Sequence, residues 1–99
     1  MNIRLLDAAY HDFADSVSNY NEECPGLGFE FANEFQQGVR RIVDYPDAWQ
    51  LVAPTIRRCL LRRFPFSIFY HLAGDELIIV AVLHQRKHPL SWRKRISFI

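Results

Sequence analysis

The sequence predicts an α+β fold: an N-terminal edge strand, then an antiparallel two-helix hairpin packed on a mainly antiparallel sheet with a three-strand C-terminal meander. Two observations predict it. Residues 8–44 carry apolar side chains at helical spacing, in two stretches separated by Pro25 and Gly26. Residues 57–83 instead divide into three short apolar runs with turn residues between them, the pattern of consecutive strands. The chain of 99 residues has the length of one domain, and we expect a single domain over residues 1–99.

The N-terminal segment predicts a strand followed by a helix. Ile3–Leu6 is a short apolar run that can pair as an edge strand, and Asp7 behind it is a residue type that caps helix N-termini. From Ala8 onward, an apolar stripe at spacings of three and four residues predicts one amphipathic helix. The stripe consists of Tyr10, Phe13, Val17, Tyr20 and Cys24.

A second helix is predicted from Leu27 to Asp44, and Pro46 ends it. Gly28 and Gly38 each weaken this helix by about 1 kcal/mol relative to alanine, so we expect close packing at both positions. Because the break between the two helices is short, they should fold back as an antiparallel hairpin. The apolar stripe is Phe31, Phe35, Val39 (or Gly38) and Ile42, and the residues expected outside it are Glu30, Asn33, Glu34, Gln37 and Arg41.

The connection Asp47–Ile56 is expected to be a loop, in which Trp49 fills the gap between the hairpin and the sheet. Three strands then follow, separated by Pro65 and by a turn at Ala73–Asp75. Because Leu77–Leu83 is apolar at every position, we expect the last strand to lie inside the sheet with both faces covered. The predicted strands are Arg57–Phe64, Phe66–Leu72 and Glu76–Leu83.

The end of the chain is predicted to be a short helix or a tail. Pro89 argues against a further strand or a long helix after Leu83. Phe98 and Ile99 are expected either to anchor a docked end or to form surface that a partner covers.

The charges are divided unequally along the chain. Residues 1–56 contain three basic and nine acidic side chains, whereas residues 57–99 contain nine basic and two acidic ones. This division predicts a dipolar surface whose basic part faces nucleic acid or an acidic protein. The alternative is that the two halves neutralise each other within the fold.

Other classes of protein are disfavoured by the composition. No stretch reaches the roughly 20 apolar residues that a membrane span needs, and the N-terminus lacks the apolar run of a signal peptide. We therefore expect a cytoplasmic protein without a membrane partner. Cys24 and Cys59 fit no ligand spacing and are expected to act as small apolar residues, so that neither a metal nor another cofactor is predicted.

The candidate site lies where the buried last strand ends, at His84. If Arg58 or Arg62 projects from the first meander strand onto the same sheet face, basic groups converge there and suit a phosphate group, with a neutral histidine as a possible acid or base. Trp92 could stack on a base. The alternative is a basic rim that docks onto an acidic protein, and binding is favoured over catalysis. Within eight residues of His84 lie Arg86, Lys87, His88 and Trp92.

The order of strand, helical hairpin, meander and short basic tail resembles the RelE/ParE superfamily of toxins from bacterial type II toxin–antitoxin systems, and is nearer the ParE branch. The resemblance covers essentially the whole chain. The segments that carry it are Pro25–Gly28, Arg40–Pro46, Arg57–Tyr70 and Ala81–Arg95, of which the last is the most specific.

This resemblance implies a growth-inhibiting toxin, of the kind used in plasmid stabilisation, that a cognate antitoxin neutralises by forming a hetero-oligomer with it. Two targets are known across the superfamily: ParE-like members inhibit DNA gyrase, and RelE-like members cut mRNA on the ribosome. A third alternative is a non-toxic binding module on the same fold.

The nuclease branch of the superfamily carries basic residues on the first meander strand, an arginine on the second, an arginine after the last strand and then an aromatic residue with an acidic proton. In this chain Arg58 and Arg86 match in part, whereas Leu60 and Ser67 stand where charge is expected. Trp92 stands in the aromatic position and cannot exchange a proton as tyrosine does. Two of the usual charges are thus missing from a nuclease site.

We therefore expect a gyrase inhibitor that is not an enzyme. Its contact surface would consist of Arg58, Arg62, Arg86, Trp92 and Arg93. Under the nuclease alternative, His84 or His88 would be the acid or base, while Arg58 and Arg86 would bind the scissile phosphate.

Overall fold

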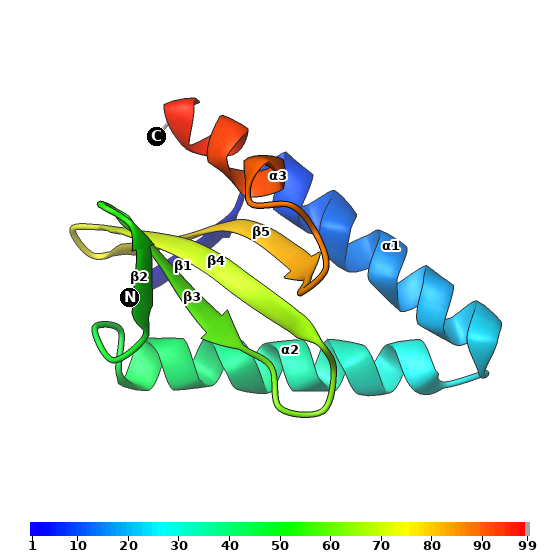
Figure 1. Ribbon diagram of the computed structural model, residues 1–99. Helices are drawn as coiled ribbons and strands as arrows, with labels where there is room; N and C mark the ends of the chain where they lie inside the picture. Colours follow the sequence, from blue (N-terminus) through cyan, green and yellow to red (C-terminus); the bar gives the residue numbers. More distant parts are fainter. Residues whose placement is uncertain (99) are drawn as a thin grey trace.

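The protein forms a five-stranded sheet with helices on both faces (Figure 1). The computed structural model describes residues 1–98, except for the side chains of Leu90, Ser97 and Phe98. The strand order is β1-β5-β4-β3-β2, with β1 parallel to β5 and the other pairs antiparallel. The elements are β1 (Asn2–Leu5), α1 (Asp7–Glu23), α2 (Leu27–Asp44), β2 (Gln50–Ala53), β3 (Ile56–Leu60), β4 (Phe66–Ala73), β5 (Glu76–His84), α3 (Leu90–Arg93) and the 3-10 helix η1 (Lys94–Phe98).

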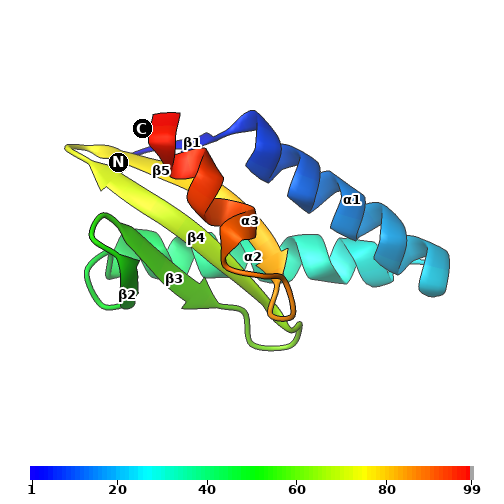
Figure 2. The same cartoon turned by 45° about the horizontal axis from the view of Figure 1, so that its top comes forward.

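The predicted α+β architecture is confirmed. The strand β1 lies at the edge of the sheet, α1 and α2 form a hairpin on one face, and β3, β4 and β5 form the meander. The last strand lies between β1 and β4, and Leu77–Leu83 is buried throughout, as its continuous apolar run predicts. Turning the molecule shows α3 and η1 lying across the sheet on the other face (Figure 2).

Two separate cores form on the two faces of the sheet. The larger one lies between the sheet and the α1–α2 hairpin, where Phe31, Phe35 and Ile42 of the predicted stripe are buried. The smaller one lies on the opposite face, here called the second face, where Trp92 of α3 packs on Phe69 of β4 and both are buried. The end of the chain is thus docked as a short helix. The predicted anchors Phe98 and Ile99 lie outside the described side chains.

Close packing explains both glycines of α2. A Cβ atom on Gly28 would lie 2.1 Å from the carbonyl oxygen of Val17 in α1, and one on Gly38 would lie 2.9 Å from Leu61 Cδ2. The Gly28 N–H also donates to Asn21 Oδ1 at 2.7 Å. The absence of a side chain on Gly28 therefore lets the two helices approach each other at the start of the hairpin.

The predicted loop Asp47–Ile56 is wrong in its middle, because Gln50–Ala53 forms the edge strand β2, antiparallel to β3. Four residues, of which two are exposed and two half-buried, are too few to show an alternating pattern, and Pro54 is part of the turn between β2 and β3. The side chain of Trp49 packs against the larger core, with the guanidinium of Arg41 6.0 Å from its ring centroid, which agrees with the predicted filling role.

The first meander strand is shorter than predicted, since β3 ends at Leu60 instead of Phe64. Glu34, expected on the outside of α2, is only 6% exposed, and its carboxylate accepts the backbone N–H groups of Arg62 and Arg63 at 2.7 and 3.1 Å. These two donors therefore bond a side chain instead of a neighbouring strand, and the chain turns away from the sheet.

The predicted details of α1 also need correction. Asp7 is the first helical residue, and the N-cap is Leu6, which makes no side-chain capping bond. Tyr10 is 58% exposed and Cys24 is exposed beyond the helix end. Of the predicted stripe, Phe13, Val17 and Tyr20 pack on the larger core, and Ala9, which was not predicted, is buried there with them.

Candidate functional site

The small side chain of Ser67 makes a hollow on the second face of the sheet. Arg58 of β3 pairs with Phe69 of β4, which pairs with Ala81 of β5. In the next row, Ser67 lies between Leu60 and Leu83. Because residues that pair across strands point to the same face, the small side chain of Ser67 leaves space beside the large Phe69 ring.

This hollow is part of a pocket of about 270 Å³ between the sheet and α3, here called the basic pocket. Three of its lining residues, Arg58, Lys87 and Arg93, are cationic, and none of the described residues that line it is acidic. Its walls are otherwise apolar or neutral. The full lining is Val52, Arg58, Ser67, Phe69, Leu83, His84, Gln85, Lys87, Pro89, Trp92 and Arg93.

Of the three cations that line the basic pocket, Arg58 is the one that belongs to a strand of the sheet. Its Nη2 donates to Gln50 Oε1 of β2 at 2.8 Å, which fixes the guanidinium across the β2–β3 pair. Its Nε is buried and has no hydrogen-bond partner among the described residues. An unpaired buried donor is costly, so this N–H is chemically suited to an anionic acceptor.

Trp92 has a structural position. Its side chain is 4% exposed, and its ring stacks on Phe69 with a centroid distance of 5.1 Å and an interplanar angle of 21°. The guanidinium of Arg93 lies 5.4 Å from the Trp92 ring centroid. The expectation that Trp92 stacks on a base therefore does not agree with its position, since one face is covered by Phe69 and little of the ring reaches solvent.

His84 lines the basic pocket, whereas Arg86 lies outside it. The Nδ1 atom of His84 accepts the backbone N–H of Arg86 at 3.0 Å, so that the proton of the neutral ring is on Nε2. The ring also contacts Phe66 edge-on at a centroid distance of 5.3 Å. The side chain of Arg86 is exposed and does not line the basic pocket, and His88 is likewise exposed in the same turn.

The strand ends bring further basic residues to the same side of the molecule. The N–H of Gln85 donates to the carbonyl oxygen of Pro65 at 2.8 Å, which joins the loop before β4 to the turn after β5. Arg62 and Arg63 are exposed on the loop before β4, and Arg86 and Lys87 are exposed on the turn after β5. These four residues are called the basic end here.

The two oppositely charged halves of the chain neutralise each other only in part. Arg63 pairs with Glu30 at 3.0 Å, Arg57 lies 3.9 Å from Asp47, and Arg95 pairs with Asp12. Five basic residues of the second half of the chain form no ion pair with a residue that the structure describes. They are Arg58, Arg62, Arg86, Lys87 and Arg93. This set includes the three cations of the basic pocket and every residue of the basic end except Arg63.

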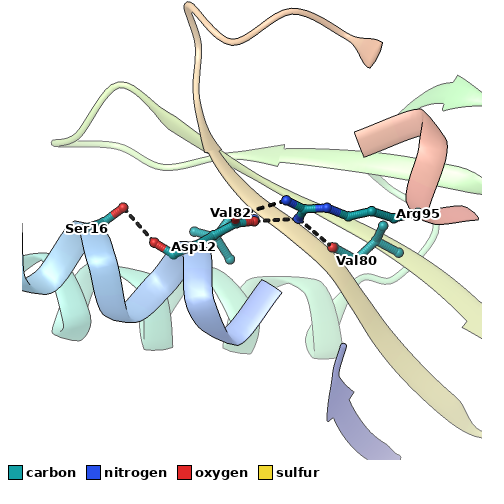
Figure 3. A network of polar contacts seen from close by, with 5 residues as sticks. All are labelled: Asp12, Ser16, Val80, Val82 and Arg95. Atoms are coloured by element: carbon teal, nitrogen blue, oxygen red, sulfur yellow. Dashed lines mark hydrogen bonds and ion pairs between the residues drawn. The ribbon is translucent and has the colours of Figure 1, made fainter. Parts of the chain in front are cut away.

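The pair Asp12–Arg95 is a feature that sequence reasoning missed (Figure 3). Asp12 Oδ2 accepts the backbone N–H of Val82 at 3.0 Å, and Arg95 Nη1 donates to the carbonyl oxygen of Val80 at 3.1 Å. The network lies next to a second pocket of about 500 Å³, which shares His84 and Lys87 with the basic pocket. No local pattern relates an aspartate in α1 to an arginine near the end of the chain.

Both cysteines are free, and burial raises the pKa of the Cys59 thiol above its ordinary value. Within the described part of the chain, no cluster of three or more His, Cys, Asp or Glu side chains could bind a metal ion. None of the helices in that part is long and apolar enough to cross a membrane.

Comparison with known proteins gives two findings. Residues 3–89 match the family model described as the ParE toxin of the type II toxin–antitoxin system parDE. A solved structure of the chromosomal ParDE toxin–antitoxin system from P. aeruginosa is similar in fold, with a TM-score of 0.74 and 20% sequence identity, over 85% of this chain and 95% of that one. The curated proteins contain no significant match.

Proposed function

The chain belongs to the family of ParE toxins of type II toxin–antitoxin systems, and from this premise we propose that it inhibits cell growth by binding DNA gyrase without cleaving a substrate. The observation that carries the proposal is the pairing of Leu60 with Ser67 on the second face. A nuclease needs charge beside the scissile phosphate and a proton donor for the leaving group. Neither side chain of this pair can supply them.

The proposed contact surface consists of the basic pocket and the basic end. Arg58 and Arg93 line the pocket, whereas Arg62 and Arg86 belong to the exposed basic end beside it. Trp92 supports this surface by packing α3 against Phe69 of β4. Unpaired cations at an interface steer an acidic partner and favour rapid association.

An antitoxin partner follows from the same premise. We propose that a cognate antitoxin, acidic where it covers the basic end, forms a hetero-oligomer with this chain in the cytoplasm and keeps it inactive. Such a pair stabilises the plasmid or other replicon that encodes it, because cells that lose the antitoxin stop growing.

Ribosome-dependent cleavage of mRNA is the second candidate. It is favoured by His84, which lines the same pocket as Arg58 and is the residue type that transfers protons near neutral pH. It is disfavoured by Arg86, whose exposed side chain is outside the pocket where the reacting phosphate would bind.

The two candidates are separated by inducing the chain without an antitoxin and assaying two purified targets. We expect loss of growth, loss of supercoiling by DNA gyrase, and intact mRNA on translating ribosomes. Arg58→Ala combined with Arg62→Ala should weaken gyrase inhibition at least tenfold. The matched control is Arg40→Ala, since Arg40 is an exposed arginine of α2 outside the basic pocket.

Each other outcome has a definite meaning. Cleaved transcripts with unaffected gyrase would overturn the proposal in favour of the nuclease, and His84→Ala should then abolish the cleavage. Normal growth after induction, with the folded protein present, would show a binding module that has lost toxicity.

A further inference from the structure

We propose that the basic pocket is a binding site for a phosphate monoester, such as the terminal phosphate of a nucleotide. This inference does not depend on gyrase as the target, although Arg58 and Arg93 belong to both surfaces. It is carried by the composition of the pocket, by the unpaired N–H of Arg58 and by the space that Ser67 leaves.

The charge of the pocket favours an anion with more than one negative charge. Arg58, Lys87 and Arg93 line it, and no acidic residue of the described lining neutralises them. A phosphate monoester carries a charge of about −1.5 to −2 at pH 7 and three acceptor oxygens. A carboxylate carries only one charge, and an internal phosphodiester likewise carries one.

The hydrogen-bond donors are suited to the same group. The buried Nε of Arg58 has no partner among the described residues, while the Nη2 atom is fixed by Gln50 at 2.8 Å. A guanidinium fixed in this way binds phosphate oxygens as a fork. Ser67 lies diagonally beside Arg58 in the strand register and adds a hydroxyl group to the pocket.

The size and the walls of the pocket limit the ligand. A volume of about 270 Å³ is at the lower end of the range for small-molecule sites, which begins near 300 Å³. Val52, Phe69 and Leu83 make part of the wall apolar. The pocket therefore suits a phosphate group with a small organic substituent, and it is too small to enclose several nucleotides.

The ligand can be a free nucleotide or the phosphorylated end of a nucleic acid strand, since both offer the same group. Calorimetric titration of the purified full-length chain at low salt would use AMP, adenosine, and one short oligonucleotide with either a 5′-phosphate or a 5′-hydroxyl. We expect AMP to bind with a Kd on the order of 0.1 mM, a weak complex on the general scale of affinities. Adenosine should bind at least tenfold more weakly, and added salt should weaken AMP binding.

Two variants place the ligand in the pocket. Arg58→Gln removes the charge and the fork, and it should weaken AMP binding at least tenfold, whereas Arg40→Gln outside the pocket should change it less than twofold. Ser67→Val fills the hollow and should also weaken binding. Circular dichroism of each variant separates loss of binding from loss of folding, and a poorly folded Ser67→Val leaves Arg58→Gln to decide.

The oligonucleotides distinguish the sources. Similar binding of AMP and of the 5′-phosphorylated strand supports a site for any phosphate monoester, and at least tenfold tighter binding of that strand supports a strand end as the ligand. Equal binding of the 5′-hydroxyl and 5′-phosphorylated strands would overturn the proposal, and so would equal binding of adenosine and AMP. The proposal would also be overturned if AMP did not bind at 10 mM, a hundred times the expected Kd of about 0.1 mM. Because gyrase is absent from these titrations, their failure leaves the proposed function to its own assays.

Discussion

Asp12 and Arg95, 83 positions apart in the sequence, form an ion pair through two N···O contacts of 2.6 and 3.1 Å. The pair lies where β1 has ended, since β1 accompanies β5 only as far as Ile79. Beyond that point Asp12 accepts the Val82 N–H and Arg95 donates to the Val80 carbonyl oxygen. Two side chains thus bond the edge of β5 where no strand pairs with it, and they connect the C-terminal segment to α1.

The first prediction concerns this ion pair. Asp12→Ala removes the carboxylate partner of a largely buried arginine and leaves the Val82 N–H without an acceptor, so it should lower the free energy of unfolding by about 3 kcal/mol. Urea denaturation followed by circular dichroism measures the change. The control is Arg4→Ala, which removes an exposed pair with Glu76 and should cost under about 1 kcal/mol. Equal losses in the two variants would contradict a stabilising role of the Asp12–Arg95 pair.

The second prediction concerns the close approach of α1 and α2. Gly28→Ala places a methyl group 2.1 Å from the Val17 carbonyl oxygen, and it should destabilise the protein by about 3 kcal/mol despite the better helix propensity of alanine. Gly74→Ala is the matched control. Gly74 has a φ of +61° in open space, so only backbone strain of about 1 kcal/mol is expected. Thermal unfolding compares the two variants. A loss of stability in Gly28→Ala smaller than that in Gly74→Ala would show that α1 and α2 can move apart at little cost in free energy.

The third prediction concerns the loop that positions Arg62. Glu34→Gln weakens the acceptor of two backbone N–H groups and should cost about 2 kcal/mol, since hydrogen bonds to charged groups are the stronger ones. Hydrogen exchange of the Arg62 and Arg63 amides should accelerate in this variant. In Glu30→Gln, which removes only an exposed ion pair with Arg63, those amides should exchange as in the unchanged protein. Accelerated exchange in both variants would argue against Glu34 as the specific anchor.

The fourth prediction separates support from contact at α3. Trp92→Ala removes a buried ring and should destabilise the protein by about 3 kcal/mol, whereas Trp92→Phe keeps an aromatic ring stacked on Phe69 and should cost less. Denaturant unfolding measures both. If Trp92 acts only by supporting α3, Trp92→Phe should also inhibit gyrase nearly as well as the unchanged chain. Lost inhibition in a stable Trp92→Phe would instead indicate direct contact with the target.

The fifth prediction concerns alkaline pH. Burial raises the pKa of Tyr70 well above its ordinary value near 10, and its hydroxyl donates to the Pro46 carbonyl oxygen at 2.7 Å. The unfolded state therefore loses this proton first, and the stability that Tyr70 contributes below pH 10 should decline as the pH rises above about 10. Urea denaturation at pH 8 and pH 11 should show a smaller decline for Tyr70→Phe. An equal decline in both proteins would assign the effect to other groups.

Local patterns determined most of the elements. The helical spacing up to Asp44 and the continuous apolar run Leu77–Leu83 are visible within single segments, and both predict the observed structure. The helical period reports which side of each helix is buried, and the unbroken run reports that both faces of the strand are covered. The strand Gln50–Ala53 was missed because four mostly accessible residues carry no such period.

The candidate site was predictable only as a set of residues. The sequence by itself determined the α+β fold, the excess of basic residues from Arg57 onward, and the neutral character of Leu60 and Ser67. Tertiary structure decided that Arg58 and Arg93 share a pocket, that Arg86 stays outside it, and that Trp92 of α3 is buried against Phe69 of the sheet. The physical reason is that a repeating pattern fixes which face of an element is apolar. Contacts between elements instead depend on how those faces pack, which no short stretch of sequence encodes.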